Sequence, residues 1–568
     1  MPLYIMETDR NDDVVLDTSL PTQEEYEAQI EEVQKTKLGS IFPLIKSEIP
    51  RVLLACITYF TVGYVYAFLR QFKDTVLFDV LTPSASLWLK IVVFFSSFWI
   101  INITNKFFMW YGINKGTDMY IFFMAGLFFI FSGAVFIKDF VNPKGALEQS
   151  LNGNVFVLRK LGVLSQIAPL VNHFIMVLFY VFFESFGSTL MSFVFMTYLN
   201  SKLTPSQMSR YIRPVYISAN LSLLATSISV STLVKKTEKY FTAKYKFVLY
   251  GLTCMAVSII LMLVYLLKKM MDRAFDQELY QGASQSKGSK KKSKAKIGML
   301  ESIKLVYNSR LLLGMTVMSL GYNFSSNIGS TVSKYVYKAY TEFLIANPHM
   351  NEEVGFDPKN IPYIYNSKEN IIVSLVVIFL MLTPAFSKLF QVFGVFAFAL
   401  VTLLCCLFSS LSSTFFAAMN YPFTNFNKKI MFGISIPAKQ PHFKLEAVFA
   451  MLSNLMIKIG KYAFYDIVKE NVSARIDPAD RALYKGVFDG VASKGGKMLG
   501  SIIGLILTNI TGVSDIRYST PAYAVFIGAI CVGWFFCILD LHANYKNAVA
   551  TNGYMKDSFS RKKKLDIK

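Results

Sequence analysis

The sequence predicts an all-α protein that crosses a membrane many times, and three properties support this prediction. The 568-residue chain is 53% hydrophobic and has a mean hydropathy of +0.41. Only 17% of its residues are charged, against about 25% in a typical soluble protein. Apolar runs close to the ~20 residues that an α-helix needs to cross a bilayer recur from residue 51 to residue 540. The chain is therefore predicted to be a polytopic α-helical membrane protein.

Residues 1–50 are expected to form a polar N-terminal tail on the cytoplasmic side, in which EEYEAQIEEVQK predicts a short helix. A first half of six membrane spans follows over residues 51–267. The fourth of these spans is long and carries Glu184 among phenylalanines, and the fifth contains Asn220. The expected spans are Val52–Leu69, Leu87–Ile103, Met119–Ile137, Val163–Tyr198, Pro214–Val234 and Phe247–Leu267.

Residues 268–310 are expected to form a basic cytoplasmic linker. Its run GASQSKGSKKKSKAK is of low complexity and too polar to bury a core. A second half of six spans follows over residues 311–541, and residues 542–568 are a basic cytoplasmic tail. The expected spans are Leu311–Tyr340, Ile371–Phe386, Phe393–Met419, two spans between Glu446 and Gly504, and Pro521–Leu541. The sequence therefore predicts twelve transmembrane helices in two six-helix halves.

The distribution of basic residues predicts the orientation. Most basic loops follow even-numbered spans, which places both termini and the linker in the cytoplasm by the positive-inside rule. Two six-helix halves joined by a basic cytoplasmic linker are typical of a major-facilitator-like transporter, whose binding site lies between the halves near the membrane midplane. The acidic N-terminus has no apolar segment of a cleavable signal peptide, so we expect the first span to remain in the membrane.

Composition argues against several other functions. The net charge is +21, which the positive-inside bias, basic tails and an anionic substrate can together explain; the basic runs flank membrane spans, so nucleic-acid binding is not expected. The six cysteines lie in apolar runs and the four histidines have no ligand spacing, so we expect neither a metal nor another cofactor. A P-loop-like run near Lys497 lacks the required lysine and Ser/Thr positions. No enzymatic activity is expected.

The densest functional signal is the charge carried by the two apolar segments between Glu446 and Gly504. A charge at the depth of a bilayer costs ~3 kcal/mol or more, so such a residue normally faces a wet cavity, a partner or a ligand. Several lysines around one cavity suit a polyanion. A glycine repeats every fourth residue from Gly496 to Gly504, which predicts close packing against another helix. The candidate site residues here are Lys458, Lys461, Asp466, Lys485, Asp489, Lys494 and Lys497.

Polar residues in other spans complete the candidate site. Lys73 is interpreted as a phosphate contact at the end of the first span, with snorkelling to the interface as the alternative. An unpaired buried carboxylate favours its neutral form, which makes Glu184 a candidate proton-coupling group; the alternative is a structural ion pair with a lysine of another helix. The full additional set is Lys73, Glu184, Asn220, Asn327 and Lys334.

Two segments of the second half, KYAFYDIVKE (461–470) and YKGVFDGVASKGGKMLGS (484–501), resemble the ATP/ADP translocase family of plastids, obligate intracellular bacteria and microsporidian parasites. Three shorter segments are similar to further family segments in the same order: FKDT around Lys73, FYVFFESFGS around Glu184 and RPVYISAN (213–220). The resemblance covers most of the membrane region, and the acidic tail and long inserts favour the microsporidian branch.

The resemblance implies a nucleotide transporter that imports host ATP by alternating access, in exchange for ADP or together with protons. It implies functional charges at Lys73, Glu184 and Lys485, with Lys497 as a second candidate for the last, and it places Ser330 where the family has a further glutamate. The implied substrates are ATP, ADP and other purine nucleotides such as GTP and GDP.

The implied location is the parasite plasma membrane facing the host cytosol, ahead of the mitosome membrane, and the lipid bilayer is the other expected partner. Two alternatives stay open at this point. One is a carrier of another organic phosphate anion. The other is a structural or scramblase-like membrane protein without transport activity.

Overall fold

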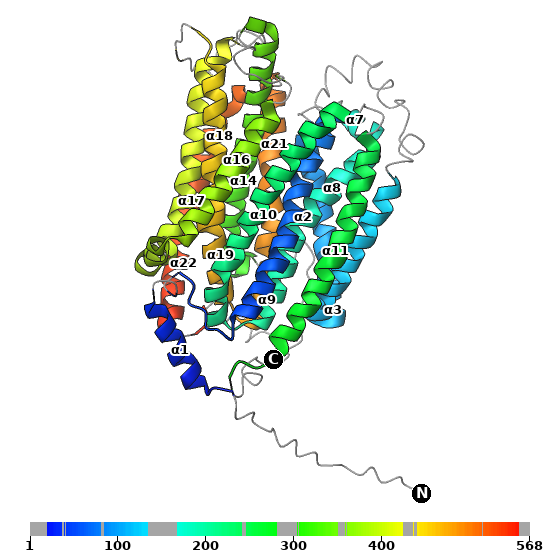
Figure 1. Ribbon diagram of the computed structural model, residues 1–568. Helices are drawn as coiled ribbons and strands as arrows, with labels where there is room; N and C mark the ends of the chain where they lie inside the picture. The colour runs from blue at the N-terminus through cyan, green and yellow to red at the C-terminus, as the bar shows by residue number, and fades with distance from the viewer. Residues whose placement is uncertain are drawn as a thin grey trace.

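The structure is a computed structural model of the chain, shown in Figure 1. The described residues form helices and turns, and no strand occurs among them. Residues 1–19, most of the expected linker (281–303), the tail from 556 and the junction between the third and fourth expected spans (135–166) lie outside the described residues. The structure describes residues 20–36, 39, 41–80, 85–134, 167–240, 246–280, 304, 306–349, 358, 361–423, 436, 440–513, 515–551 and 553–555.

Two sets of long helices lie side by side (Figure 1). Helix α1 (Gln23–Lys35) lies at the bottom of this view, where α22 also ends. The N-terminal set consists of α2 (Ile49–Val80), α3 (Ala85–Ala134), α7 (Ile167–Asn172), α8 (Phe174–Ser188), η2 (Thr189–Phe195), α9 (Met196–Lys202), α10 (Pro205–Tyr240) and α11 (Lys246–Asp276). The C-terminal set consists of α14 (Arg310–Ala346), α16 (Ile361–Leu382), α17 (Pro384–Asn420), α18 (Phe443–Ile459), η6 (Gly460–Tyr465), α19 (Asp466–Ala474), α20 (Pro478–Lys485), η7 (Gly486–Ala492), α21 (Ser493–Thr511) and α22 (Thr520–Ala550).

The short helix expected in the N-terminal tail is confirmed as α1, and its start follows from two capping residues. The Thr22 hydroxyl accepts a hydrogen bond from the Glu25 amide at 3.3 Å, and the Glu25 carboxylate accepts one from the Thr22 amide at 2.9 Å. This reciprocal arrangement satisfies two of the N–H groups that the start of a helix leaves unpaired.

Helix α3 is a helical hairpin rather than one straight rod. Gly112 has φ +74°, in the left-handed region that favours glycine. The rings of Phe107 and Phe123 lie only 6.1 Å apart, whereas the same sixteen residues of a straight helix would span ~24 Å. The chain therefore turns back at Gly112, and its two legs correspond to the expected second and third spans.

Nine described helices are long and apolar enough to cross a membrane. One of the nine is α3, whose 48-residue apolar stretch includes both legs of the hairpin. Helix α14 and the continuous rod α20–η7–α21 are also long but more polar, and they are not among the nine. The all-α membrane fold is confirmed, and the number of twelve crossings stays a prediction.

Helix α10 begins before the position expected for the fifth span. It starts at Pro205, so Pro214 lies inside the helix instead of at its start. The reason is that Met208, Tyr211 and Ile212 are buried on one helical face, and this apolar face stabilises the extra turns by packing against the core.

Helix α11 extends beyond the expected sixth span, to Asp276, into the region assigned to the linker. Ion pairs stabilise this extension: Lys268 Nζ lies 2.9 Å from Asp118 Oδ1 of α3 and 2.8 Å from Asp272 Oδ2, one turn further along α11. Lys269 adds a second contact to Asp118, at 2.8 Å. The charged residues at this boundary therefore stabilise helix ends.

The two sets meet in a shared apolar core at the end of the molecule where α1 lies. Tyr59 of α2 and Tyr211 of α10 belong to the same buried cluster as Val468 of α19. Beside this cluster, Arg481 of α20 donates a hydrogen bond to the Asn200 carbonyl at 3.4 Å. This contact between the sets forms a floor beneath the cavity described below.

Three of the long rods contain a π-helical segment, namely η2, η6 and η7. Such segments are rare and occur frequently at functional sites. Two of them contain a charged candidate residue, Lys461 in η6 and Asp489 in η7, and η2 begins five residues after Glu184. The irregular turns therefore lie where the sequence places charges inside apolar helices.

Candidate functional site

A cavity lies between the N-terminal and C-terminal sets and is lined by side chains of both. Among the described residues, eight basic and three acidic side chains line it, so its wall carries an excess of positive charge. Charges within a membrane protein normally face a wet cavity or a charged partner, and this excess suits a polyanion. The basic residues are Arg70, Lys73, Lys90, Lys334, Lys458, Lys461, Lys469 and Lys497, and the acidic residues are Glu184, Glu369 and Asp466.

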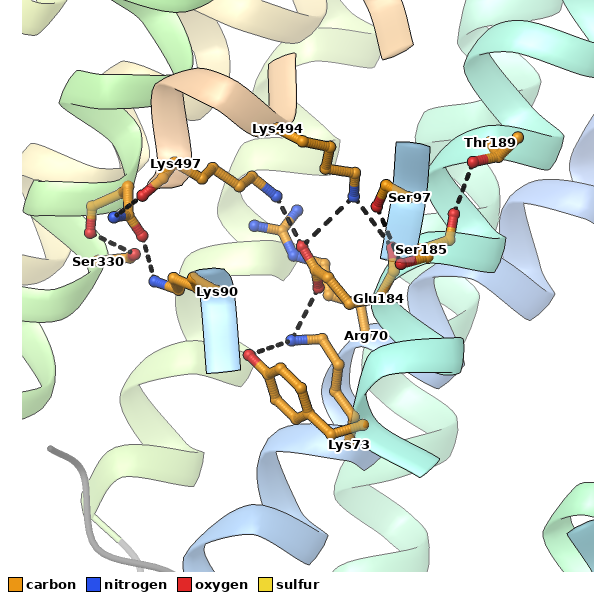
Figure 2. Close-up of polar contacts among 12 residues, drawn as sticks. Arg70, Lys73, Lys90, Ser97, Glu184, Ser185, Thr189, Ser330, Lys494 and Lys497 are labelled. Atoms are coloured by element: carbon orange, nitrogen blue, oxygen red, sulfur yellow. Dashed lines mark hydrogen bonds and ion pairs between the residues drawn. The ribbon is translucent and has the colours of Figure 1, made fainter. Parts of the chain in front are cut away.

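Glu184 is the centre of an ion-pair cluster in this cavity (Figure 2), which we call the Glu184 hub: Glu184, Lys73, Lys494 and Lys497. Glu184 Oε2 lies 2.9 Å from Lys73 Nζ, and Oε1 lies 2.7 Å from Lys497 Nζ. Lys494 Nζ lies 3.9 Å from Oε1 and donates to the Glu184 carbonyl at 3.1 Å. Glu184 and Lys73 belong to the N-terminal set, whereas Lys494 and Lys497 lie one turn apart on α21 of the C-terminal set. The hub therefore joins the two sets of helices.

The hub corrects one premise of the sequence analysis. Glu184 was expected to be an unpaired carboxylate among phenylalanines, and this expectation is wrong, because lysines from α2 and α21 pair with it. The alternative of an ion pair with lysines of other helices describes the contacts. A role of Glu184 in proton coupling stays a prediction.

Asn327 of α14 makes a second link between the two sets. Its Oδ1 accepts a hydrogen bond from Lys90 of α3, and its Nδ2 donates to the Lys497 carbonyl at 2.9 Å and the Ser501 hydroxyl at 3.2 Å. The Ser330 hydroxyl donates to the Asn327 carbonyl at 3.0 Å (Figure 2). The position where the family resemblance implies a glutamate therefore carries a hydroxyl that bonds to its own helix.

The glycine repeat of α21 packs against other helices, as predicted: Gly496 and Gly500 face α14, and Gly504 faces Tyr523 of α22. A Cβ atom at Gly496 would lie 2.4 Å from the Leu320 carbonyl oxygen, and one at Gly500 would lie 3.0 Å from Asn327 Nδ2. Only glycine permits this approach of the two helices. The close packing brings the Lys497 carbonyl within reach of Asn327, so it also positions the lysine of the hub.

Lys458 and Lys461 both line the cavity, which confirms that they share a helical face. Lys458 Nζ lies 2.7 Å from Glu369 Oε1 and donates to Asn370 Oδ1 at 2.6 Å. Lys461 lies over the rings of Tyr462 and Tyr322, with Nζ 5.1 and 5.8 Å from the ring centroids. The two lysines therefore have different environments, one a salt bridge and the other a pair of aromatic rings.

Asp466, Lys485 and Asp489 lie in a second ion-pair network around Lys469. Lys469 Nζ lies 2.7 Å from Asp489 Oδ1 and 3.6 Å from Asp466 Oδ1. The Lys485 side chain is fully buried at 0% exposure and pairs with Glu470. Asp466 and Lys469 line the cavity, whereas Lys485 and Asp489 are not among its described lining residues. This placement favours a structural role for Lys485, and substrate binding by Lys485 and Asp489 stays a prediction.

The remaining predicted residues differ in how they relate to the cavity. Asn220 lines it, but its side-chain amide donates to the Tyr216 carbonyl of its own helix at 2.8 Å. Lys334 also lines it, from α14. Lys494 is buried and is not among the described lining residues, but it contacts Glu184, which lines the cavity.

Sequence reasoning missed four charged residues that line the cavity: Arg70, Lys90, Glu369 and Lys469. Arg70 precedes Lys73 by three residues, so the shared helical face could have identified it. Glu369 was missed because the eighth span was expected from Ile371, whereas α16 begins at Ile361. The polar residues at the start of this helix face the cavity, and their polarity concealed the helix in the sequence.

Long apolar helices around a central cavity with excess positive charge define a class of protein, a multi-pass membrane transporter for anions. The particular family follows from comparison with known sequences. The chain belongs to the TLC ATP/ADP transporter family, whose sequence model matches residues 27–545. The family resemblance predicted from the sequence is thereby confirmed.

Named relatives agree with this assignment. The chain is 27% identical to ADP,ATP carrier protein 1 of Encephalitozoon cuniculi (strain GB-M1), over 96% of each chain. It is 26% identical to ADP,ATP carrier protein 1 of Paranosema grylli, over 94% of each chain. It is 24% identical to ADP,ATP carrier protein 1 of Chlamydia pneumoniae, over 87% of this chain and 91% of that protein.

The fold is similar to that of major facilitator superfamily transporters. The solved structure of the proton:xylose symporter XylE, bound to 6-bromo-6-deoxy-D-glucose, superposes with a TM-score of 0.50. The alignment covers 86% of this chain and 94% of that one at 12% identity. At this identity the likeness concerns the fold alone, and it confirms the predicted major-facilitator-like architecture.

Proposed function

We propose that this protein carries ATP and ADP across a membrane by exposing the cavity alternately to the two sides. The observation that supports this proposal most directly is the Glu184 hub, in which lysines from both sets of helices surround one carboxylate. The family assignment and the names of the relatives favour ATP and ADP as the polyanionic substrates. The major-facilitator-like fold supports alternating access.

The hub suggests how nucleotide binding begins. Glu184 neutralises part of the charge of Lys73 and Lys497. The phosphate chain of a nucleotide carries several negative charges and bonds to lysine through charge-assisted hydrogen bonds, which are roughly twice as strong as neutral ones. The phosphates therefore compete with the Glu184 carboxylate for the same ammonium groups, and a bound phosphate chain contacts both sets of helices.

The proposal extends to three finer points. GTP and GDP carry the same phosphate chains, so we include them among the substrates. The cell membrane of an intracellular parasite, facing the host cytosol, is the proposed location, with the mitosome membrane as the second choice. Exchange of ATP for ADP is the proposed mode, and the runner-up is uptake coupled to protons through Glu184.

Uptake of radiolabelled ATP into vesicles that contain the purified protein tests the proposal. Uptake should be faster into vesicles preloaded with ADP than into empty ones, and unlabelled nucleotides should inhibit it while sugar phosphates should not. Lys497→Gln should reduce uptake strongly. The matched control is Lys338→Gln, because Lys338 lies on α14 with its side chain 48% exposed. Equal inhibition by sugar phosphates, or no saturable uptake by the wild type, would contradict nucleotide transport.

The proton-coupled runner-up has its own test. Glutamine at position 184 cannot release a proton, so Glu184→Gln should bind nucleotide but lose the response of net uptake to an imposed pH gradient. Gradient-driven uptake and binding are measured on the same purified variant. A normal pH response of Glu184→Gln would exclude Glu184 as the proton carrier.

A further inference from the structure

A second group of polar side chains lies in the cavity, apart from the Glu184 hub. Asn366, Glu369 and Asn370 of α16 all line the cavity, and their spacing of three and four residues places them on one helical face. Lys458 of α18 pairs with Glu369 Oε1 at 2.7 Å and donates to Asn370 Oδ1 at 2.6 Å. None of these residues takes part in the hub, so the cavity has a second polar region.

Tyr337 of α14 belongs to the same region. It lines the cavity, and its ring lies 5.3 Å from that of Tyr365, which precedes Glu369 by one turn of α16. Tyr337 therefore packs against α16 beside Glu369. We call Glu369, Tyr337 and Lys458 the α16 subsite.

Two polar atoms of the α16 subsite are buried and have no hydrogen-bond partner among the described residues. The side chains of Glu369 and Tyr337 are each 1% exposed. Neither Glu369 Oε2 nor the Tyr337 hydroxyl has a hydrogen-bond partner within the described part of the chain. Most buried polar atoms in proteins are hydrogen-bonded, so an exception calls for an explanation. A ligand that supplies a donor to Glu369 Oε2 is such an explanation.

The chemistry of a nucleotide indicates which part of it supplies this hydrogen-bond donor. Its phosphate oxygens are acceptors and carry negative charge, so a carboxylate repels them. Donors occur only in the nucleoside, as the ribose hydroxyls and the N–H groups of the base. An ionised carboxylate only accepts hydrogen bonds, and Glu369 is therefore suited to the nucleoside end of the substrate and unsuited to its phosphates.

The location of the subsite agrees with this assignment. Ser330 of α14 bonds to Asn327, which links the helix to the hub. Tyr337 lies seven residues further along α14, a distance of ~10 Å along a helix. This offset allows one nucleotide to place its phosphates at the hub and its nucleoside at the α16 subsite.

We propose that Glu369, Tyr337 and Lys458 form the nucleoside-binding part of the cavity, in which Glu369 Oε2 accepts a hydrogen bond from the ribose or the base and Lys458 holds the carboxylate in place. This inference rests on the proposed nucleotide transport. It adds the residues that distinguish a nucleotide from a bare polyphosphate.

Binding of ATP and of inorganic tripolyphosphate to the purified full-length protein tests this inference. Glu369→Gln should weaken ATP binding about tenfold, because a hydrogen bond to a charged group is lost. The same change makes the cavity more positive, so tripolyphosphate binding should be unchanged or tighter. Opposite effects on the two ligands are expected only if Glu369 contacts the nucleoside. A parallel loss for both ligands would overturn the assignment and leave Glu369 as a structural partner of Lys458.

Two further variants keep the test decisive if Glu369→Gln folds poorly. Tyr337→Phe removes only a hydroxyl and should weaken ATP binding severalfold without affecting tripolyphosphate. Glu342→Gln is the matched control, because it removes a carboxylate from α14 whose side chain is 47% exposed, and it should leave both affinities unchanged. The subsite would be refuted if Tyr337→Phe binds ATP as tightly as the wild type and Glu369→Gln loses affinity for ATP and tripolyphosphate alike.

Nucleotide analogues identify the donor. If the ribose supplies it, 2′,3′-dideoxy-ATP should bind wild type and Glu369→Gln equally. If the base supplies it, the penalty of Glu369→Gln should be larger for ATP than for purine riboside triphosphate, which lacks the 6-amino group. Wild-type protein that binds tripolyphosphate as tightly as ATP would overturn the subsite while leaving phosphate recognition intact. Wild-type protein that binds neither ligand would instead overturn the proposed function itself.

Discussion

Replacing Glu184 by glutamine tests whether the phosphates compete with this carboxylate. The change removes the negative charge that pairs with Lys73 at 2.9 Å and Lys497 at 2.7 Å. Removal of one partner of a buried ion pair typically costs ~3–5 kcal/mol. The Lys497 side chain is 23% exposed, so we expect the lower end of that range, about 3 kcal/mol, for the protein without substrate.

ATP should reverse this loss. Its phosphates supply the negative charge that Lys73 and Lys497 then lack, and they no longer have to displace a carboxylate. We therefore expect Glu184→Gln to bind ATP about tenfold more tightly than the wild type, which corresponds to ~1.4 kcal/mol. Saturating ATP should raise the unfolding temperature of the variant by more than that of the wild type.

The assay combines thermal unfolding with calorimetric ATP binding, and Asp118→Asn is the matched control. Asp118 also pairs with two lysines, at 2.9 Å from Lys268 and 2.8 Å from Lys269, but it is not among the described residues that line the cavity. The control should lose stability without any gain in ATP affinity. If Glu184→Gln binds ATP more weakly, and ATP stabilises it no more than it stabilises Asp118→Asn, the competition argument is wrong.

Neighbouring contacts give three more predictions. Calorimetry should show that Lys497→Gln raises the Kd for ATP about tenfold, and an unchanged ATP affinity would contradict the role of the hub. Lys485→Gln removes the closest partner of the buried Glu470, so it should lower the free energy of unfolding by ~3 kcal/mol. Gly496→Val should destabilise the packing of α21 on α14 by ~1–3 kcal/mol in thermal unfolding, whereas Gly528→Val should be tolerated because a Cβ there meets no atom within 4 Å. ATP affinity should fall as salt increases, but less than for exposed ion pairs, which are screened over about 8–10 Å; an affinity independent of salt would argue against recognition of phosphates.

The membrane fold was predictable because apolar length is a local property of the sequence. The hairpin of α3 agrees with two expected spans, since Gly112 lies between them. The start of α16 was not predictable in this way, because Asn366 and Glu369 are polar but face a cavity instead of water. Hydropathy does not distinguish these two environments, so helices that line a polar cavity are shortened when spans are predicted from apolar runs.

The candidate site was predictable in its charges but not in its pairs. Lys458 and Lys461 were assigned to one face because helical spacing is local. The partners of Glu184 lie more than a hundred residues before it on α2 and more than three hundred after it on α21, so only the packing of the two sets could reveal them. The same limit applies to Lys485. The sequence predicts that this lysine is buried, but only the structure shows that its partner is Glu470.

The position of the hub between the two sets of helices favours exchange of one nucleotide for another over uptake alone. Glu184 belongs to the N-terminal set and Lys497 to the C-terminal set, so their ion pair connects the two sets. Lys90 and Asn327 make a second such connection beside it. Movement of one set past the other would separate these pairs and leave buried charges uncompensated, which is costly. A nucleotide that takes over the lysines removes this cost, because its phosphates compensate the charge while the pair between the sets is broken. On the proposed cycle, the protein therefore reorients readily only with a nucleotide bound, and import of one nucleotide requires export of another.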